Sequence, residues 1–551
     1  MSLPLAQIIA ARRDVVIKSY EAAKAENARN YNERLDDKAT SEYIYPNQMQ
    51  DATCIVNAFY NDNVRAVSIQ KKTKVGADGL MIELAKLMAT HIDDNFVVNP
   101  DNIRIITGMS NAIWEKDMKD KAPTFLKNKI FHHGKLSKSE LSNIKNAFIM
   151  IDEIDNGDKE YQILHQTLKE AGILDVTHMN QHNNRFVFIS ATMIRELHDL
   201  YKWGNLHKSF KMNIPQSYIG HCDFLDLGII QEFYSLNTLD KALLWIQTDI
   251  LDRYNNNFRV HIVRVNKKNC TVISNACNTK GLIFRNHNST DRLTEAEIDE
   301  FFNNPLTNHI VLAVNGFFRR ANLIPNDWKL RIGATHELYT KKVDNNVQIQ
   351  GLPGRMTGYW RNYIEGGHLT GPYRTSIKAI KEYEKNYNNP YGCNSYQTSG
   401  FKKESGRVSA GTTMLSPKHI KNLTAIELPI IRQPCSRPIT IIPINDTEKS
   451  KFKIDKDAIV NIIRTRIPAI YDDYQSYKTH FWKIDTPNKC EKYGLHKMME
   501  TNAYSSETNV RKNEKDKNIL MIYLHNNNLI ISPWAGSEKA LEASATVDNA
   551  N

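Results

Sequence analysis

Three carboxylates stand at the end of an apolar run in the stretch FIMIDEIDNGD, which spans residues 148–158. Asp152 and Glu153 directly follow four apolar residues, and Asp155 comes two positions after Glu153. In open parallel sheets, ligands bind beyond the carboxyl ends of the strands, where these acids would lie. One carboxylate there can hold Mg²⁺, and its neighbour can orient an attacking water. The pattern favours a nucleotide site over the alternative, an acidic turn in solvent.

The elements that would position these acids form an alternating series. Short β-branched runs alternate with amphipathic segments, which predicts βαβ units and a mainly parallel sheet. The expected strands are residues 65–70, 102–108, 147–153 and 185–192, and a helix is expected at 80–92. A second series follows, with helices expected at 240–254 and 294–304 and strands at 258–265, 281–286 and 309–317. The sequence therefore predicts two α/β units in tandem.

The two ends of the chain differ from this core. Residues 1–40 are rich in Ala, Glu, Lys and Arg, which predicts a charged helix. Residues 388–413 are polar, basic and rich in Gly and Ser, which is typical of a linker. A small mixed domain is expected beyond them, with strands at 437–444 and 519–534, the latter a hairpin. The small polar residues from Gly536 onward predict a disordered tail.

Net charge and composition limit the kinds of ligand and partner that the chain is expected to bind. The formal net charge is +11 and the pI about 9.0, which favours polyanions because Lys and Arg displace condensed counterions from phosphates. The seven cysteines form no C-x-x-C pair, so we expect no zinc site and a reducing intracellular compartment, cytoplasmic or nuclear. No run of about 18 apolar residues occurs, so no transmembrane helix and no membrane partner are expected.

A second strand-end motif brings a family resemblance. The apolar run FVFISAT ends in Ser190, Ala191 and Thr192. One βα unit after the acidic strand end, this tripeptide resembles the coupling motif of superfamily two helicases. The chain is similar to this superfamily, the DEAD-like nucleic-acid-dependent ATPases, over residues 45–372. The resemblance implies that these three residues couple an ATP cleft to a nucleic-acid channel.

The same resemblance assigns roles in the first α/β unit. Asp152 and Asp155 would serve the metal ion, and Glu153 would orient the attacking water. Gln48 falls where the family's adenine-reading glutamine would stand. Thr107 and Gly108, in IITGMSN, resemble the first strand-end motif that touches the nucleic-acid backbone.

Two further motifs are similar to those of the family's second domain. Gly316, followed by Arg319 and Arg320, resembles motif five, which contacts nucleic acid. Motif six is represented by Gln350, Gly354 and Arg355. In the family this domain lends arginines to the phosphate of a nucleotide bound by the first domain, where they stabilise charge in the transition state.

The spacing of motif six departs from the family pattern. Gln350 precedes Arg355 by five positions instead of four, and the usual second arginine would stand at Gly358. Arg361 lies three residues further on. Arg355 is therefore the stronger candidate for the arginine finger, with Arg361 as the second. The structural alternative for this stretch is a Gly-rich hairpin with incidental charge.

The phosphate loop that should accompany these motifs is degenerate. A Walker sequence ends in G-K-[ST], with the lysine on the β- and γ-phosphates and the hydroxyl on Mg²⁺. At the corresponding place, between the first strand and the helix at 80–92, the sequence is KKTKVGADGLM. Gly76 stands where the last glycine belongs, but Ala77 replaces the lysine and Asp78 the hydroxyl.

Such a loop can still bind phosphate through backbone N–H groups and the helix dipole. Lys74, two residues before Gly76, is the best placed substitute cation, with Lys71 and Lys72 as alternatives. Asp78 would repel phosphates unless it coordinates Mg²⁺. The residues expected to bind the nucleotide are Gln48, Thr73, Lys74, Gly76, Ala77, Asp78 and Gly79.

The resemblance implies an α/β fold with two tandem RecA-like parallel-sheet domains, to which we add a helical N-terminal arm and a C-terminal α+β accessory domain. The expected boundaries are 1–44 for the arm, 45–215 and 216–372 for the two domains, 373–424 for a linker, and 425–551 for the accessory domain with its tail.

The implied function is an ATP-dependent helicase or translocase that uses ATP and Mg²⁺ and tracks single-stranded DNA or RNA. The degenerate loop leaves a second interpretation open, a catalytically silent helicase-like binding or scaffold protein. A third is the motor of a larger replication, transcription or packaging complex, with its partner protein on a separate chain. The Asn- and Lys-rich texture is similar to helicases of large DNA viruses or phages, which would place the chain in a host cell or virion.

Overall fold

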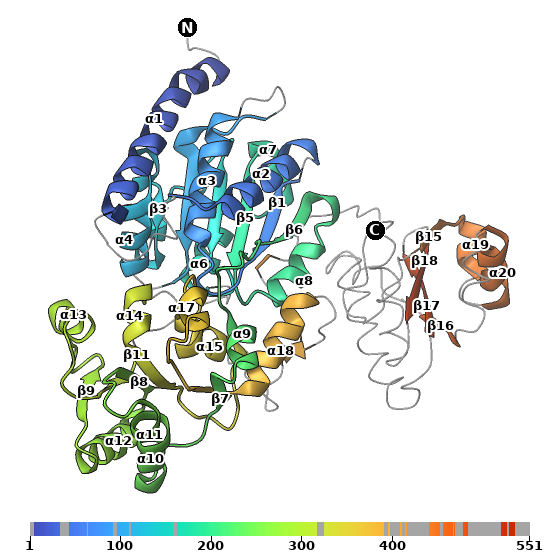
Figure 1. The fold of residues 1–551 in the computed structure, drawn as a ribbon. Coiled ribbons are helices and arrows are strands. Elements are labelled where there is room, and N and C mark those ends of the chain that lie inside the picture. The colour runs from blue at the N-terminus through green and yellow to red at the C-terminus, as the bar shows by residue number, and fades with distance from the viewer. Residues whose placement is uncertain are drawn as a thin grey trace.

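Two α/β units, a helical arm and a small α+β unit make up the described part of the chain (Figure 1). The computed structural model describes residues 5–32, 43–62, 64–91, 96–109, 112–157, 162–316, 324–390, 395–396, 408–409, 414–415, 440–451, 456–466, 468, 478–482, 519–525 and 528–534. No helix within these ranges is long and apolar enough to cross a bilayer.

Six parallel strands form the first sheet in the order β3-β2-β4-β5-β1-β6. They are β1 (Ala66–Gln70), β2 (Ile103–Thr107), β3 (Ile130–Phe131), β4 (Phe148–Asp152), β5 (Arg185–Ser190) and β6 (His207–Lys211). Every residue of β1, β2, β4 and β5 is buried, as expected when helices cover both faces of a parallel sheet. Because β5 separates β1 from β4, the segments that follow these three strands converge at one edge.

The helices of the first unit surround this sheet. They are α2 (Pro46–Asn61), α3 (Ala77–Thr90), α4 (Ala112–Lys121), α5 (Thr124–Lys127), α6 (Ile163–Ala171), α7 (Val176–His182) and α8 (Arg195–Tyr201), with short 3₁₀ turns at Pro100–Asn102, His133–Lys138 and Gly204–Leu206. The arm is one long helix, α1 (Leu5–Asn32), that packs against α3. The Tyr20 hydroxyl on α1 donates a 2.6 Å hydrogen bond to Glu83 on α3, which joins the arm to the first unit.

The second unit repeats the architecture. Its six parallel strands run in the order β7-β12-β11-β8-β10-β9. They are β7 (Ile230–Glu232), β8 (Val260–Arg264), β9 (Ile283–His287), β10 (Ile310–Val314), β11 (Ile332–His336) and β12 (Tyr373–Thr375). The helices are α9 (His221–Asp226), α10 (Leu239–Trp245), α11 (Asp252–Tyr254), α12 (Lys267–Thr279), α13 (Glu295–Asn303), α14 (Asn326–Arg331), α15 (Asn345–Gln350), α16 (Leu352–Met356), α17 (Arg361–Glu365) and α18 (Ile377–Asn388), with a π-helical segment at Ile246–Leu251.

A four-stranded sheet of order β15-β18-β17-β16 forms the C-terminal unit. It contains β15 (Thr440–Pro443), β16 (Lys478–Trp482), β17 (Ile519–His525) and β18 (Asn528–Trp534), together with α19 (Asp446–Lys451) and α20 (Lys456–Arg466). The pairing of β17 with β18 is antiparallel, as the expected hairpin requires, and that of β16 with β17 is parallel. A separate two-stranded ladder joins β13 (Ser395–Tyr396) to β14 (Val408–Ser409).

The predicted fold class is confirmed by the two parallel sheets, the helical arm and the α+β unit. The structure differs from the predicted linker at 373–424, because β12 and α18 belong to the second unit. Leu415 is also buried in the core of the first unit, where its carbonyl accepts a 2.7 Å hydrogen bond from the Trp203 indole. In the three larger sheets, strands β3, β6, β7, β11, β12 and β16 were not expected from the sequence. The proposed disordered tail lies outside the described residues.

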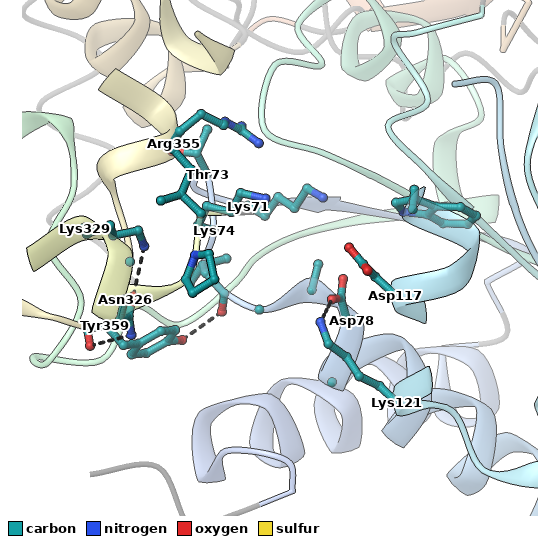
Figure 2. A pocket seen from close by; sticks show the side chains of 18 of the residues that line it. Lys71, Thr73, Lys74, Asp78, Asp117, Lys121, Asn326, Lys329, Arg355 and Tyr359 are labelled. Carbon is teal, nitrogen blue, oxygen red and sulfur yellow. Dashed lines mark hydrogen bonds and ion pairs between the residues drawn. The ribbon is translucent and has the colours of Figure 1, made fainter. Parts of the chain in front are cut away.

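The segment that joins β1 to α3 leads from the core to a cleft. It carries Lys71, Thr73 and Lys74 (Figure 2). Helix α3 begins directly after Gly76, whose φ of +85° lies in the left-handed region. A Cβ atom on Gly76 would lie 2.5 Å from Nε2 of Gln48, so both the backbone conformation and the available space require glycine here.

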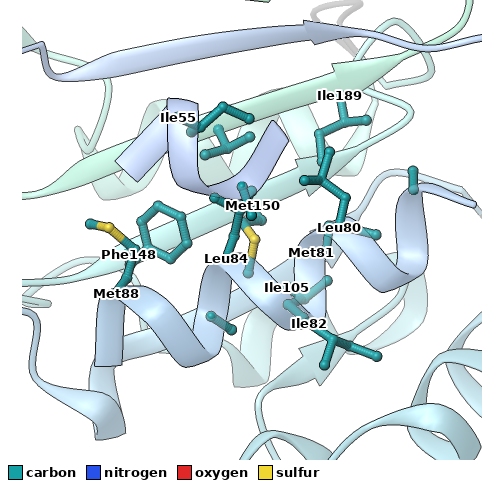
Figure 3. Close-up of a cluster of buried hydrophobic side chains, with 14 of the residues drawn as sticks. Ile55, Leu80, Met81, Ile82, Leu84, Met88, Ile105, Phe148, Met150 and Ile189 are labelled. Carbon is teal, nitrogen blue, oxygen red and sulfur yellow. The ribbon is translucent and has the colours of Figure 1, made fainter. Parts of the chain in front are cut away.

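The core under this segment consists of α2 and α3 packed on one face of the first sheet (Figure 3). Leu80, Leu84 and Met88 of α3 face Ile105 and Met150 of the sheet, and all five are fully buried. Burial of each large apolar side chain stabilises the folded state by about 1.5–3 kcal/mol. This packing fixes α3, and with it the N-terminal end that borders the cleft.

The contribution of this core can be measured with a matched pair of isoleucines. Ile105→Ala should lower the free energy of unfolding of the first unit by about 2–5 kcal/mol, because it leaves a cavity between β2 and α3. Ile113→Ala, at a position 42% exposed on α4, should cost about 0.5 kcal/mol or less. Urea unfolding followed by circular dichroism provides both values. Equal losses in the two variants would contradict the packing described.

Candidate active site

Three hydrogen bonds to its carbonyl groups hold the loop between β1 and α3 in place. The hydroxyls of Tyr218 and Thr357 donate to the Thr73 carbonyl at 2.7 and 2.9 Å, and the Tyr359 hydroxyl donates to the Val75 carbonyl at 2.8 Å. All three donors come from the chain beyond the first sheet. The loop of the first unit is thereby fastened to the second.

This fastening orients the N–H groups of the loop. A trans peptide directs its N–H opposite to its carbonyl, so the N–H groups of Lys74 and Gly76 point away from the side chains that hold Thr73 and Val75. Within the described residues, no hydrogen bond engages the backbone N–H groups of residues 72–76. Unused N–H groups before a helix N-terminus are the usual means by which proteins bind phosphate.

The acids at the end of β4 lie across from this loop. The Lys71 ammonium bridges Asp152 Oδ1 at 2.8 Å and Glu153 Oε1 at 3.1 Å, and the Trp114 indole donates to Asp152 Oδ2 at 3.0 Å. Burial alone lowers the pKa of Lys71, but the two carboxylates outweigh it and raise that pKa above its ordinary value. The φ of Glu153 is +51°, a conformation that costs free energy in a residue with a side chain and that clusters at functional sites.

The Asp155 carboxylate makes different contacts from those of Asp152 and Glu153. Its carboxylate accepts hydrogen bonds from the Ser190 hydroxyl at 2.6 Å and the Thr192 hydroxyl at 2.7 Å. The Ser190 hydroxyl also lies 3.4 Å from Glu153 Oε2. The two strand-end motifs thus meet, as expected for β4 and β5 as neighbours, and Asp155 binds the S-A-T hydroxyls without lining the cleft.

The second unit brings motif six to these acids. Gln350, at the end of α15, directs Nε2 to Glu153 Oε2 at 3.4 Å, and the Arg355 guanidinium donates to Gln350 Oε1 at 3.2 Å. All three side chains are buried. A continuous polar path therefore runs from Arg355 through Gln350 to the acid at the end of β4.

A cleft of about 850 Å³ opens between these groups, within the range of small-molecule sites. All seven residues expected to bind a nucleotide line it, and so do Asp152, Glu153, Ala191 and Arg355. Gln48 is less available than expected, because its amide already bonds to the Gly76 carbonyl at 2.5 Å and to the Tyr45 N–H at 3.0 Å.

The cleft contains a lysine that no carboxylate pairs with among the described residues. Lys74, with φ +58°, has no hydrogen-bond or ion-pair partner among the described residues. Burial, followed by the charge of Arg355, lowers the pKa of Lys74 well below its ordinary value, against the weaker pull of Asp78. Asp78 is itself paired with Lys121 at 2.7 Å, which lowers the Asp78 pKa to about 2. Figure 2 shows these groups around one space.

Several predicted residues lie away from the cleft. Arg361 bonds to Asp223 at 2.6 Å and to the Tyr218 carbonyl at 3.0 Å, and it does not line the cleft. Thr107 is fully buried. Gly108 packs so closely on the Asn156 carbonyl that it has no room for a side chain. None of these three residues lines the cleft.

Of the three residues of the second unit that were predicted to bind nucleic acid, the structure describes one. Gly316 follows β10, is exposed and has a φ of +86° with open space around it. Arg319 and Arg320 lie outside the described residues.

Sequence reasoning missed several groups that line the cleft, among them Trp114, Lys121, Lys329 and Tyr359. None of these four belongs to a recognisable motif. Tyr359 stands next to the expected second arginine position. Lys71 was a secondary candidate, although its position directly after β1 placed it at the same sheet edge as the acids.

Comparison with known proteins gives structural matches only. No protein-family model matches the sequence, and no curated protein does. A variant of S. cerevisiae Dbp5 bound to RNA and ADP BeF3 is 12% identical with a TM-score of 0.37, covering 63% of this chain and 92% of that one. A DEAD box protein from Methanococcus jannaschii is 13% identical with a TM-score of 0.33, covering 64% and 97%.

The helicase domain of Pyrococcus furiosus Hef is 8% identical with a TM-score of 0.32, covering 61% of this chain and 97% of that one. TM-scores below 0.5 describe a loose superposition, so no function follows from these matches. The candidate site stands on its own geometry.

The ion pair of Asp78 and Lys121 should make the stability of the first unit fall measurably at acidic pH. The folded pKa of Asp78, about 2, lies below its ordinary value of 3.8. The stability that the pair contributes is therefore complete above about pH 4 and is lost as the pH falls towards 2. Urea unfolding of the native chain and of Lys121→Met from pH 7 to pH 2 should show a stability difference that shrinks over this window.

Asp78→Asn provides the control for this titration. In that background Lys121→Met should cost nearly the same at every pH, because the titrating partner is absent. A native-minus-variant difference that stays constant down to pH 2 would show that Asp78 is not held by Lys121.

Proposed function

We propose that the chain is a nucleic-acid-dependent ATPase of the helicase or translocase type, with ATP hydrolysed in the cleft between its two α/β units. One observation carries the proposal. Gln350 of the second unit reaches Glu153 of the first and binds Arg355 through its other amide atom, beside a loop whose N–H groups are unengaged. This arrangement joins a phosphate-binding surface, an acid and a cation in trans, which phosphoryl transfer requires.

The triphosphate fits the loop and its surroundings. The N–H groups of residues 72–76, the N-terminus of α3 and Lys74 together provide donors and positive charge at one place. An anion beside Lys74 would favour its charged form and so offset the burial that lowers its pKa. In our proposal Lys74 takes over the part of the Walker lysine, and Arg355 stabilises the charge that develops in the transition state.

Mg²⁺ fits the carboxylates of the same cleft. Magnesium sites commonly use one or two carboxylates, waters and the phosphates of the substrate. Asp152 and Asp78 both line the cleft, and Asp78 stands where the Walker hydroxyl would be. When bound, the ion would neutralise phosphate charge. Asp155, which bonds to Ser190 and Thr192, is reassigned in this proposal from metal binding to coupling.

Glu153 is the group proposed to orient the attacking water. Its backbone strain, its contact with Gln350 and its ion pair with Lys71 hold the carboxylate in one orientation. Lys71 must release at least one of the two acids when substrate binds. The phosphates and Mg²⁺ provide the competing charges that make this exchange possible.

Nucleic acid is the proposed second ligand, on the strength of the net charge of +11 and of the coupling contact. The hydrogen bonds of Asp155 with the hydroxyls of Ser190 and Thr192 join the two strand ends that flank the cleft. A movement of Glu153 would therefore be transmitted to the S-A-T segment. Gly316, exposed beyond β10 with open space around it, is the described residue of the second unit that we propose contacts the nucleic-acid backbone. DNA or RNA, and any partner protein of a larger complex, are left to experiment.

A catalytically silent nucleic-acid-binding protein is the second candidate, and one observation favours it. Lys71 neutralises both Asp152 and Glu153, while Ala77 and Asp78 replace the lysine and hydroxyl of the Walker loop. A site locked in this way would keep the fold and lose turnover. The two variants below separate the candidates.

Glu153→Gln should abolish turnover and spare binding. The amide keeps the size of the side chain but cannot position water for attack, so kcat should fall by about 10²–10³-fold or more while the Kd for ATP changes little. Turnover is measured as phosphate release with single-stranded nucleic acid present. Asp223→Asn, outside the cleft, serves as the matched carboxylate control. Unchanged turnover in Glu153→Gln would place the chemistry elsewhere.

Lys74→Ala should distinguish an unorthodox ATPase from a silent protein. If Lys74 replaces the Walker lysine, its loss should cost about 2–4 kcal/mol in transition-state stabilisation. In a silent protein the variant changes nothing, and Ala77→Lys with Asp78→Thr should restore nucleotide binding. One calorimetric titration series with ATP on the native chain and both variants decides the matter. Tight binding that survives Lys74→Ala would defeat the assignment of Lys74.

A further inference from the structure

Lys329 on α14 is a buried lysine that no sequence motif singled out. Lysine is seldom fully buried unless its ammonium is satisfied. Here the ammonium donates to the Asn326 side chain at 3.0 Å and to the Thr357 carbonyl at 2.9 Å. Thr357 also binds the Thr73 carbonyl through its hydroxyl. The same threonine therefore joins Lys329 to the phosphate loop.

The glycine at position 358 leaves room for the Lys329 ammonium. The family resemblance expects a second arginine at position 358, and the chain has glycine there. Its φ is +139°, which side chains rarely adopt, and a Cβ atom on it would lie 2.8 Å from the Lys329 ammonium and 4.0 Å from Lys74 Cβ. The space that a side chain at position 358 would need is therefore occupied by the charge of Lys329.

Basic side chains from both units gather around Lys329. Lys329, Lys74 and Arg355 all line the cleft, and the charges of Arg355 and Lys329 both act against the protonation of Lys74. Like charges gathered in a partly buried space repel one another. A chain of phosphates, with several negative oxygens, would remove this repulsion at all three cations together.

We propose that Lys329 binds the phosphate chain of the nucleotide and supplies, from α14, the charge that the missing second arginine would bring. The inference rests on the proposed ATP site and extends it to a residue outside the family's motifs. It also accounts for the Asn326 and Thr357 bonds, which fix the ammonium against Gly358 at the border of the cleft. A lysine that contributed only to the stability of the fold would leave phosphate affinity unchanged.

The test compares a ligand with phosphates and one without. Titration calorimetry gives Kd for the β,γ-imido analogue of ATP and for adenosine, on the native chain, Lys329→Met and Lys329→Arg. Lys329→Met should weaken the analogue by about tenfold to a hundredfold, the loss expected for one charge-assisted hydrogen bond, and leave adenosine unchanged. Lys329→Arg should restore most of the analogue's affinity. Lys208→Met, whose ammonium pairs with Asp62 outside the cleft, should match the native chain.

The ratio of the two Kd values separates a binding role from a folding role. Both ligands are titrated into the same sample, so unfolded protein lowers the number of sites and leaves the ratio intact. A native ratio in Lys329→Met, or a loss for both ligands that Lys329→Arg does not restore, would overturn the inference alone. Failure of the native chain to bind either ligand would instead overturn the proposed function.

Discussion

The rest of the structure depends on the hydrogen bonds by which the second unit holds the loop between β1 and α3 of the first. Tyr218, Thr357 and Tyr359 hold the Thr73 and Val75 carbonyls, and peptide planarity then decides where the N–H groups of the loop point. Without this contact the loop would keep its place between β1 and α3, but its N–H groups would have no fixed direction. The cleft, its charges and its access to Arg355 all follow from it.

The cleft gathers several basic side chains of both units in one space. Lys71 is paired with the acids at the end of β4 and Lys121 with Asp78, whereas Lys74 has no such partner in the described residues. Lysines from the loop and from α14 line the same space, where Ala77 stands at the position expected of a Walker lysine. A degenerate motif in the sequence does not by itself mean an absent function, because charge can enter a site from a different element.

Much of the fold could be predicted from the sequence, since β1, β2, β4 and β5 are buried on both faces and read as continuous apolar runs. The contact of Asp155 with Ser190 was not predicted, since Asp155 was expected to serve the metal ion, and it depends on β4 and β5 being neighbours in the sheet. Other features depend on contacts between distant residues. Asp223, which holds Arg361, and Gly358, which makes room for Lys329, have no signature in the local sequence. Short strands such as β12 were missed because three residues carry too little periodicity.

The most direct test of this account is the steady-state rate of ATP hydrolysis by the native chain, measured with Mg²⁺ in the presence and absence of single-stranded RNA and DNA. The account predicts a Mg²⁺-dependent rate that rises when a single strand is added, because the coupling contact between Asp155 and the S-A-T hydroxyls joins the two sites. A rate no higher than that of Glu153→Gln under every condition would contradict it.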